Sequence, residues 1–276
     1  MLQISQLFVY PVKSLGGVPV ATTEITDKGL KYDRRWMLVD DNLSFITQRE
    51  CPQMSLLKVQ IGNGFLTISD KIFNHSDLII PFDEFDNGQY DVTIWNAVCR
   101  ANGTNKCIDQ WFSELLKINC RLMYMPDETM RPVDTTSGYA PKEKFTSFAD
   151  AYPFLMLSEE SLNDLNTRLQ TPVSINRFRP NLVFTGATPY FEDKLEDFEI
   201  NEVKFTGLEN CARCSIITIN QDNAAISKEP LKTLSTYRRS GNNVCFGRNV
   251  VHSGIGKISV GDKILIGQNI LSTPTF

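Results

Sequence analysis

Short alternating runs of apolar and polar residues fill residues 1 to about 100, and this pattern predicts β-strands. The run at 36–39 is wholly apolar, and the runs at 56–61 and 65–68 flank a turn at 62–64. An Asn-Gly step between two apolar runs is a strong signal for a β-hairpin. We therefore expect the first half of the chain to be built of strands.

A helix is predicted after these strands. Its apolar residues fall at positions i, i+3, i+4 and i+7, and they are Ile108, Trp111, Phe112 and Leu115. Thr104 and Asn105 precede them and are both possible helix caps. We expect this helix to close a first domain.

Two more helices are predicted in the second half. Ser158 caps the first, whose apolar face is formed by Leu162, Leu165 and Leu169. Pro230, placed in a first helical turn, opens the second, which carries Leu231, Leu234 and Tyr237.

Short strands are expected in the rest of the second half. Ile200 and Val203 flank a hairpin turn, residues 257–264 suggest two strands turned at Gly261, and residues 215–219 have β-type composition. Helices that decorate a barrel-like sheet fit this pattern best. The fold class predicted is mixed α+β and predominantly β.

The region 126–149 is rich in helix and strand breakers and has little periodicity, so it is the expected linker or mobile loop. We place the domain boundary near its start, with one domain at 1–122 and another at 123–276. A chain of 276 residues is long enough for two such packed units.

Composition excludes several classes of function. A formal net charge of -4 and a pI near 5.4 give no basic footprint, so we expect no nucleic acid as a partner. The N-terminus has no charged segment followed by an apolar one, and no window resembles a membrane span of about 20 apolar residues. We expect a cytoplasmic protein without a membrane partner. Its seven scattered cysteines are expected to be reduced thiols.

The motif Cys211-Ala212-Arg213-Cys214 is the strongest chemical signal in the chain. A thiolate is the reactive and metal-binding form of cysteine, and the fixed charge of Arg213 beside Cys214 favours it. A zinc site with Cys245 and His252 is one alternative, although structural zinc sites normally have two close ligand pairs. A thioredoxin-like pair is less favoured still, because that motif begins a helix. Two ordinary half-buried thiols are the remaining alternative.

Other polar residues suggest an anion-binding pocket. Arg179 and Asn181 are two residues apart before a strand, so they share one face of an extended segment. Lys13 and Ser14 lie in a glycine-bearing turn after the first strand, and Arg34 precedes a later strand. Taken singly, each of these charges is more often a solvated group or a surface ion pair.

Basic residues recur where turns interrupt apolar runs. These positions are expected to gather around an anion, and they are Lys13, Arg34, Arg35, Arg49, Arg177, Arg179 and Arg213.

Taken together, six ordered segments resemble the MOSC-domain family, named for the C-terminal domain of molybdenum cofactor sulfurase. The likeness is closest to its amidoxime-reducing and bacterial YcbX-like members, and it covers nearly the whole chain. The segments are 10–14, 33–36, 157–166, 178–181, 211–214 and 227–234. The resemblance implies a MOSC N-terminal β-barrel domain at 1–122 and a MOSC domain, also a β-barrel, at 123–276.

The resemblance also implies roles for particular residues. Cys214 corresponds to the cysteine that coordinates molybdenum, which is a soft metal that accepts a thiolate. Asp150 matches a residue expected to manage protons near the metal, although an Asp before a helix is more often a cap. The positions expected to hold the pterin and its phosphate are Lys13, Ser14, Arg34, Arg179, Asn181 and Arg213.

Four residues depart from the family pattern or lack an assigned role. Ala212 stands where relatives often have a hydroxyl, so one hydrogen bond to the cofactor is expected to be missing. Ala151 and Tyr152 stand where amidoxime-reducing relatives have Thr and Ser. Cys211 is expected to be structural or to support the site, because one protein thiolate suffices for the metal.

The implied function is a molybdenum cofactor-dependent reductase of N-hydroxylated small molecules such as hydroxylamines and amidoximes. No cysteine beyond Cys245 is present to hold an iron-sulfur cluster, so an external electron donor is expected, either a ferredoxin, a flavodoxin or a flavin reductase. The alternative is a carrier of the cofactor or of sulfur without turnover of its own. Pyridoxal phosphate enters only as a family-level association, through the separate domain of the sulfurase.

Overall fold

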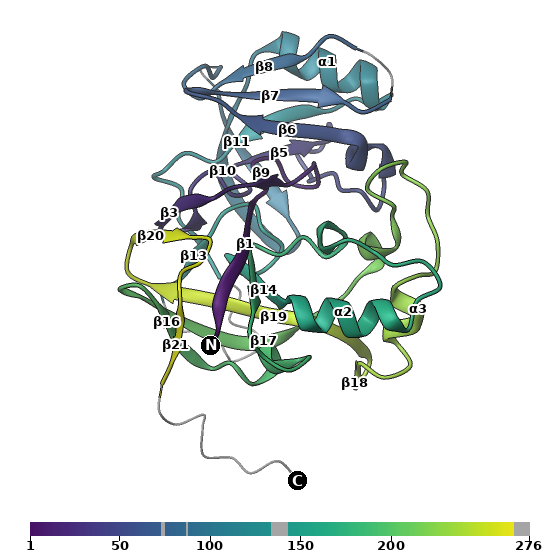
Figure 1. Ribbon diagram of the computed structural model, residues 1–276. Coiled ribbons are helices and arrows are strands. Elements are labelled where there is room, and N and C mark those ends of the chain that lie inside the picture. Colours follow the sequence, from purple (N-terminus) through teal and green to yellow (C-terminus); the bar gives the residue numbers. More distant parts are fainter. Residues whose placement is uncertain (73–74, 87, 134–142, 268–276) are drawn as a thin grey trace.

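The computed structural model describes residues 1–72, 75–86, 88–133 and 143–267, and it has two bodies (Figure 1). Strands predominate within these ranges, which confirms the predicted mixed α+β and mainly β fold. No helix in the described part of the chain has the length and apolar character that crossing a membrane requires.

The upper body of Figure 1 contains two curled sheets and one helix. One sheet has the order β5-β11-β10-β9 and the other has the order β6-β7-β8. The elements are β5 (Trp36–Val39), β6 (Leu57–Ile61), β7 (Phe65–Asp70), β8 (Leu78–Pro81), β9 (Gln89–Ile94), β10 (Ala97–Gly103), α1 (Lys106–Leu116) and β11 (Arg121–Tyr124).

Two sequence predictions are confirmed in this body. Strands β6 and β7 form the antiparallel hairpin, with Ile61 opposite Leu66. Helix α1 begins after Asn105, whose side chain accepts a hydrogen bond from the Ile108 amide at 3.0 Å. Asn105 is therefore the cap, whereas the hydroxyl of Thr104 donates to a carbonyl of β11.

A nine-stranded sheet forms the centre of the lower body. Its order is β2-β1-β15-β14-β19-β17-β16-β21, and β18 pairs with β19 outside this path. The strands are β1 (Gln3–Val9), β2 (Val18–Pro19), β14 (Phe154–Ser158), β15 (Leu182–Thr185), β16 (Asp197–Ile200), β17 (Val203–Ala212), β18 (Arg239–Ser240), β19 (Asn243–Ser253) and β21 (Ile264–Ile266).

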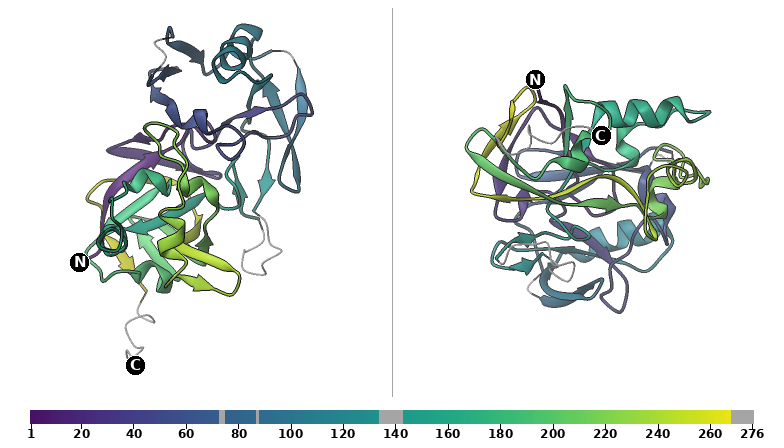
Figure 2. Two further views of the ribbon diagram at one scale, coloured as in Figure 1. Left: turned by 90° about the vertical axis from the view of Figure 1, so that its right-hand side faces the viewer. Right: turned by 90° about the horizontal axis from the view of Figure 1, so that it is seen from below.

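Strands within the first 30 residues pair with strands of this lower body, whereas Val12 and Leu15 pack in the core of the upper body. Strand β1 pairs antiparallel with β15, with Leu7 opposite Leu182. A three-stranded sheet has the order β20-β3-β4, formed by Gly256–Ser259, Thr22–Thr26 and Gly29–Leu30. Figure 1 shows β1 running from the N-terminus in the lower body towards the upper body, and the left view of Figure 2 agrees. The division at residue 122 stays a prediction.

The predicted helices of the second half are present but shorter. Helix α2 (Glu159–Thr167) is capped by the Ser158 hydroxyl, as predicted, but it ends before Leu169. Helix α3 (Leu231–Leu234) is a single turn that precedes β18. Pro230 is the residue before this helix, and not part of its first turn as predicted. The apolar residues after each helix still pack on the same core.

Of the two hairpins predicted in the second half, one is present and the other is not. Ile200 pairs with Val203, as expected for the hairpin between β16 and β17. Strands β20 and β21 flank Gly261, but they pair with β3 and β16 respectively instead of with each other. Residues 215–219 do not form a strand, because Ser215–Thr218 is a 3-10 helix.

The expected linker contains a short two-stranded sheet. Arg131–Pro132 (β12) pairs with Phe145–Thr146 (β13), and the linker residues 134–142 lie outside the described part of the chain. The side chain of Arg131 donates to the carbonyls of Ser147 at 2.8 Å and Ala149 at 2.6 Å. This segment is thereby anchored just before Asp150.

A fragment comprising residues 123–276 should fail to fold by itself, because it lacks the β1 partner of β15 and the β3 partner of β20. Long apolar strand edges left without a partner favour aggregation. We expect no cooperative thermal transition for this fragment, and recovery of one when residues 1–122 are co-expressed. A cooperative transition of the fragment alone, at the temperature of the intact chain, would contradict the account.

Candidate functional site

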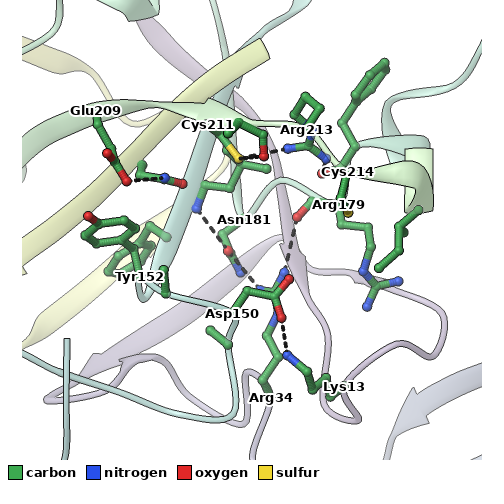
Figure 3. A pocket seen from close by; sticks show the side chains of 18 of the residues that line it. Lys13, Arg34, Asp150, Tyr152, Arg179, Asn181, Glu209, Cys211, Arg213 and Cys214 are labelled. Carbon is green, nitrogen blue, oxygen red and sulfur yellow. Dashed lines mark hydrogen bonds and ion pairs between the residues drawn. The ribbon is translucent and has the colours of Figure 1, made fainter. Parts of the chain in front are cut away.

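A pocket of about 300 Å³ lies where loops from both halves of the chain meet (Figure 3). This volume is at the lower end of small-molecule sites. The structure brings all the predicted site residues together in its lining, which includes Lys13, Ser14, Arg34, Asp150, Arg179, Asn181, Arg213 and Cys214. Cys211 lines it as well.

Several of these residues have an unusual backbone conformation. Ser14, Arg34 and Arg179 have φ angles of 68°, 48° and 58°. Non-glycine residues adopt this left-handed region rarely and at a cost, and such residues cluster at functional sites. Three residues with a strained backbone conformation thus surround one pocket.

A buried hydrogen-bond network supports the floor of the pocket. Asp33 accepts hydrogen bonds from the Tyr10 amide at 2.8 Å, from Arg34 at 2.6 Å and from Asn181 at 3.0 Å. The Asn181 amide also donates to the Phe8 carbonyl, and its oxygen accepts from Arg34. Asn181 is 1 % exposed. Its hydrogen bonds are directed into the protein, and it holds the Arg34 guanidinium in place.

Tyr10 brings two cations close together. The guanidinium carbons of Arg34 and Arg179 each lie 4.4 Å from the centre of its ring. Attraction between a cation and an aromatic ring offsets part of the repulsion between the two guanidinium groups. Burial raises the pKa of Tyr10 to about 12, so the phenol is neutral, and burial lowers the pKa of Arg179 to about 10.

The two cysteines of the motif have different partners. Arg213 donates to Cys211 Sγ at 3.2 Å and to the Phe178 carbonyl at 2.8 Å. The sulfur of Cys214 instead accepts from Arg49 Nη2 at 3.4 Å. Among the described residues, Arg49 rather than Arg213 is thus the hydrogen-bond donor to Cys214, and the expected effect of the Arg213 charge on Cys214 stays a prediction.

Burial raises the pKa of the Cys211 thiol, and the charge of Arg213 opposes this rise. Cys214 is partly exposed and lines the pocket. Cys211 is partly exposed and lines the pocket as well, so the two thiols differ in their hydrogen-bond partners rather than in exposure.

Lys13 and Asp150 form an ion pair at the edge of the pocket. Burial, offset in part by Asp150, lowers the pKa of Lys13 to about 8. Burial disfavours the charged form of Asp150, but Lys13 and Arg49 outweigh it and hold the pKa of this carboxyl below its usual range. Asp150 is therefore a carboxylate at neutral pH, and Lys13 is mostly protonated.

The chemistry of these donors fits a ligand with an anionic part and a soft metal. The lining contains the cations Lys13, Arg34, Arg179 and Arg213 and the accessible sulfur of Cys214. Within the described residues, the Nε of Arg213 is buried and has no hydrogen-bond partner. Such a donor is costly unless a ligand satisfies it. The residues present are thus compatible with a molybdenum-pterin cofactor.

The zinc alternative receives no support. The described part of the chain contains no group of three His, Cys, Asp or Glu residues able to hold a metal. His252 Nε2 lies 2.8 Å from the Thr26 carbonyl, and its ring packs against Phe154. Cys245 is buried.

Two residues that contact the pocket lining could not be assigned to the site from the sequence. Arg49 was expected only as one of several basic residues near an anion, yet it contacts Cys214 and Asp150. Trp95 carried no signal, because it occupies a hairpin turn whose strands are remote in sequence from the cysteine motif; its indole N–H donates to Asp150 at 3.3 Å.

Comparison with known proteins agrees with the fold. The sequence profile of the MOSC N-terminal beta barrel domain matches residues 1–119, and that of the MOSC domain matches residues 143–265. The chain belongs to the MOSC-domain family, with both of these domains.

Two kinds of relative are similar over almost the whole chain. Human mitochondrial amidoxime-reducing component 1 is 32 % identical, and the match covers 96 % of this chain and 83 % of the human protein. Rat mitochondrial amidoxime reducing component 2 is 30 % identical, covering 95 % of this chain and 82 % of that protein. Rice molybdenum cofactor sulfurase is 30 % identical over 98 % of this chain, which spans 35 % of its length.

Anion binding in the pocket should weaken as pH rises through about 8, the pKa of Lys13. The ammonium attracts an anion and the amine does not, so affinity is constant well below this pH and falls above it. Sulfate is a suitable probe, because its charge stays constant from about pH 6.5 to about pH 9.5 whereas Lys13 titrates. Calorimetric titration of the protein with sulfate measures this dependence.

Lys13→Met is the matched variant, because it keeps most of the side-chain volume without the amine. We expect weaker sulfate binding with little pH dependence in this range. The same fall in affinity with pH in Lys13→Met would show that another group is responsible.

Proposed function

We propose that this protein is a molybdenum cofactor-dependent reductase of N-hydroxylated compounds such as hydroxylamines and amidoximes. The observation that carries the proposal is the partly exposed Cys214 sulfur in a pocket lined by cations from both halves of the chain. The amidoxime-reducing relatives, similar over nearly the whole chain, support the same reaction class.

Cys214 would ligate the metal, and the cations and hydroxyl of the lining would hold the pterin and its phosphate. When bound, the cofactor supplies the two-electron chemistry that a reduction of N–OH to N–H requires. Arg213 would donate from its Nε, which has no protein partner among the described residues. Ser14 would donate from the turn after β1, and Lys13, Arg34 and Arg179 would contribute positive charge.

Asp150 would act on protons at the substrate. Its carboxylate is held ionised by Lys13, so it accepts a hydrogen bond from an N–H or O–H group of the substrate. About half of its side chain is exposed towards solvent. Lys13 lies beside it as a donor whose pKa of about 8 is close to neutral pH. Lys13 can therefore give up a proton near neutral pH, whereas Asp150 stays ionised and acts as the hydrogen-bond acceptor.

The electrons would come from an external donor, and a ferredoxin, a flavodoxin and a flavin reductase all remain candidates. A carrier of the cofactor or of sulfur is the second candidate function, because the sulfurases are 30 % identical to this chain. The carrier would hold the cofactor, or a persulfide on Cys214, without reducing substrates.

Replacing the sulfur by oxygen in Cys214→Ser should weaken the binding of molybdenum and abolish the reduction of an amidoxime, because a hydroxyl is a poor ligand for a soft metal. Metal analysis, pterin fluorescence after oxidation and substrate turnover with a chemical reductant measure these losses. Cys107→Ser is the matched control, since Cys107 is exposed on α1.

Stoichiometric molybdenum with turnover in the wild type supports the reductase. A wild-type protein that carries persulfide but no molybdenum would favour the sulfur carrier, and molybdenum without turnover would favour the cofactor carrier. Full turnover by Cys214→Ser would reject the assigned role of this sulfur.

Asp150→Asn should slow amidoxime reduction on the order of a hundredfold, the usual contribution of a positioned acid or base. The amide cannot accept a proton, and it leaves the Lys13 ammonium without its counter-charge, which lowers the pKa of Lys13 further. The alkaline limb of the pH–rate profile should therefore move to lower pH. An unchanged rate and profile would remove Asp150 from the reaction.

A further inference from the structure

Trp95 lies on the turn between β9 and β10 of the upper body, next to a residue that lines the pocket. Its indole N–H donates to Asp150 Oδ1 at 3.3 Å, and Asp150 belongs to the pocket lining. The side chain is 48 % exposed, which is unusual for a tryptophan with a fixed position. The N-terminal half thus places an aromatic surface beside a site formed mainly by the C-terminal half.

The turn itself does not explain a tryptophan at this position. Ile94 pairs with Ala97, so Trp95 and Asn96 form a two-residue hairpin turn. Turns of this length favour Asn and Gly, and Trp95 adopts a φ of 53° that is unfavourable for a bulky residue. Strain of this kind is retained where the side chain has a use elsewhere.

Neighbouring side chains hold the indole in one orientation. The Phe45 ring lies 5.0 Å from the Trp95 ring, at an interplanar angle of 57°. The Arg49 guanidinium carbon lies 4.8 Å from the indole centre. The same guanidinium donates to Cys214 Sγ at 3.4 Å. A single guanidinium group therefore separates the aromatic surface from the sulfur.

We propose that Trp95 is a specificity-determining residue, whose exposed ring favours planar conjugated N-hydroxylated substrates over compact aliphatic ones. The proposal rests on the proposed function. A planar substrate stacks on the indole while its polar N–H groups donate to the Asp150 carboxylate beside it. An aliphatic substrate keeps the hydrogen bond but loses the stacking contact.

Kinetics with benzamidoxime and acetamidoxime test this selectivity. Stacked aromatic pairs gain a free energy that corresponds to between about twofold and tenfold in affinity. Trp95→Leu should therefore lower the ratio of kcat/KM for benzamidoxime to kcat/KM for acetamidoxime by this factor, because the loss of the indole hydrogen bond to Asp150 affects both substrates alike. Trp95→Phe keeps a smaller aromatic ring and should restore most of the selectivity.

Tryptophan emission gives a binding measurement that does not depend on turnover. The chain has three tryptophans, of which Trp36 is buried and Trp111 belongs to α1. The unreactive planar cation benzamidine should change the emission of the wild type and of Trp111→Phe. It should leave that of Trp95→Phe unchanged, and acetamidine should have little effect on any of them.

The kinetic experiment and the fluorescence experiment together distinguish a failure of the Trp95 proposal from a failure of the proposed function. A protein that reduces neither amidoxime but binds benzamidine at Trp95 would reject the reductase and keep the aromatic recognition surface. Equal slowing of both substrates in Trp95→Leu would overturn the specificity role. Unchanged wild-type emission with benzamidine would overturn it as well.

Discussion

The buried carboxylate of Asp33 joins the two halves of the chain, and the candidate site depends on it. It accepts hydrogen bonds from the end of β1, from Arg34 and from Asn181, which lies immediately before β15. Burial raises the pKa of Asp33, and the hydrogen bonds and the charge of Arg34 oppose that rise. Removing one partner of such a buried charged network leaves the others without compensation, which is usually strongly destabilising. The loops that form the pocket are therefore coupled through this residue.

Positive charge gathers in the pocket although the whole chain is acidic. The described lining contains four cations and two carboxylates, whereas the chain has a formal net charge of -4. Desolvation works against this concentration of charge, as the lowered pKa values of Lys13 and Arg179 show. Tyr10 and Asp33 reduce the cost by contacting the guanidinium groups. A bound anion would reduce it further, which is a physical reason for an anionic ligand at this place.

Much of the fold and most of the charged residues in the lining could be predicted from the sequence, because their signals are local. The Asn105 and Ser158 caps and the turn at 62–64 each depend on a few adjacent residues. The pairing of β1 with β15 could not be predicted, because it joins segments separated by about 170 residues and both are ordinary apolar strands.

Side-chain direction was the harder problem at the site. Adjacency in sequence suggested that Arg213 acts on Cys214, but the hydrogen-bond donor to the Cys214 sulfur is Arg49, and Arg213 donates to Cys211. Arg49 and Trp95 reach the pocket from the upper body, so only the packing of the two bodies brings them there. Short spacing rules cannot supply that information.

The central claim is that the Cys214 sulfur binds molybdenum within this pocket. X-ray absorption at the molybdenum edge tests it most directly, because the spectrum counts the sulfur atoms around the metal. Protein loaded with the cofactor should show one more sulfur neighbour than Cys214→Ser loaded under the same conditions. Identical sulfur coordination in the two proteins would contradict the account.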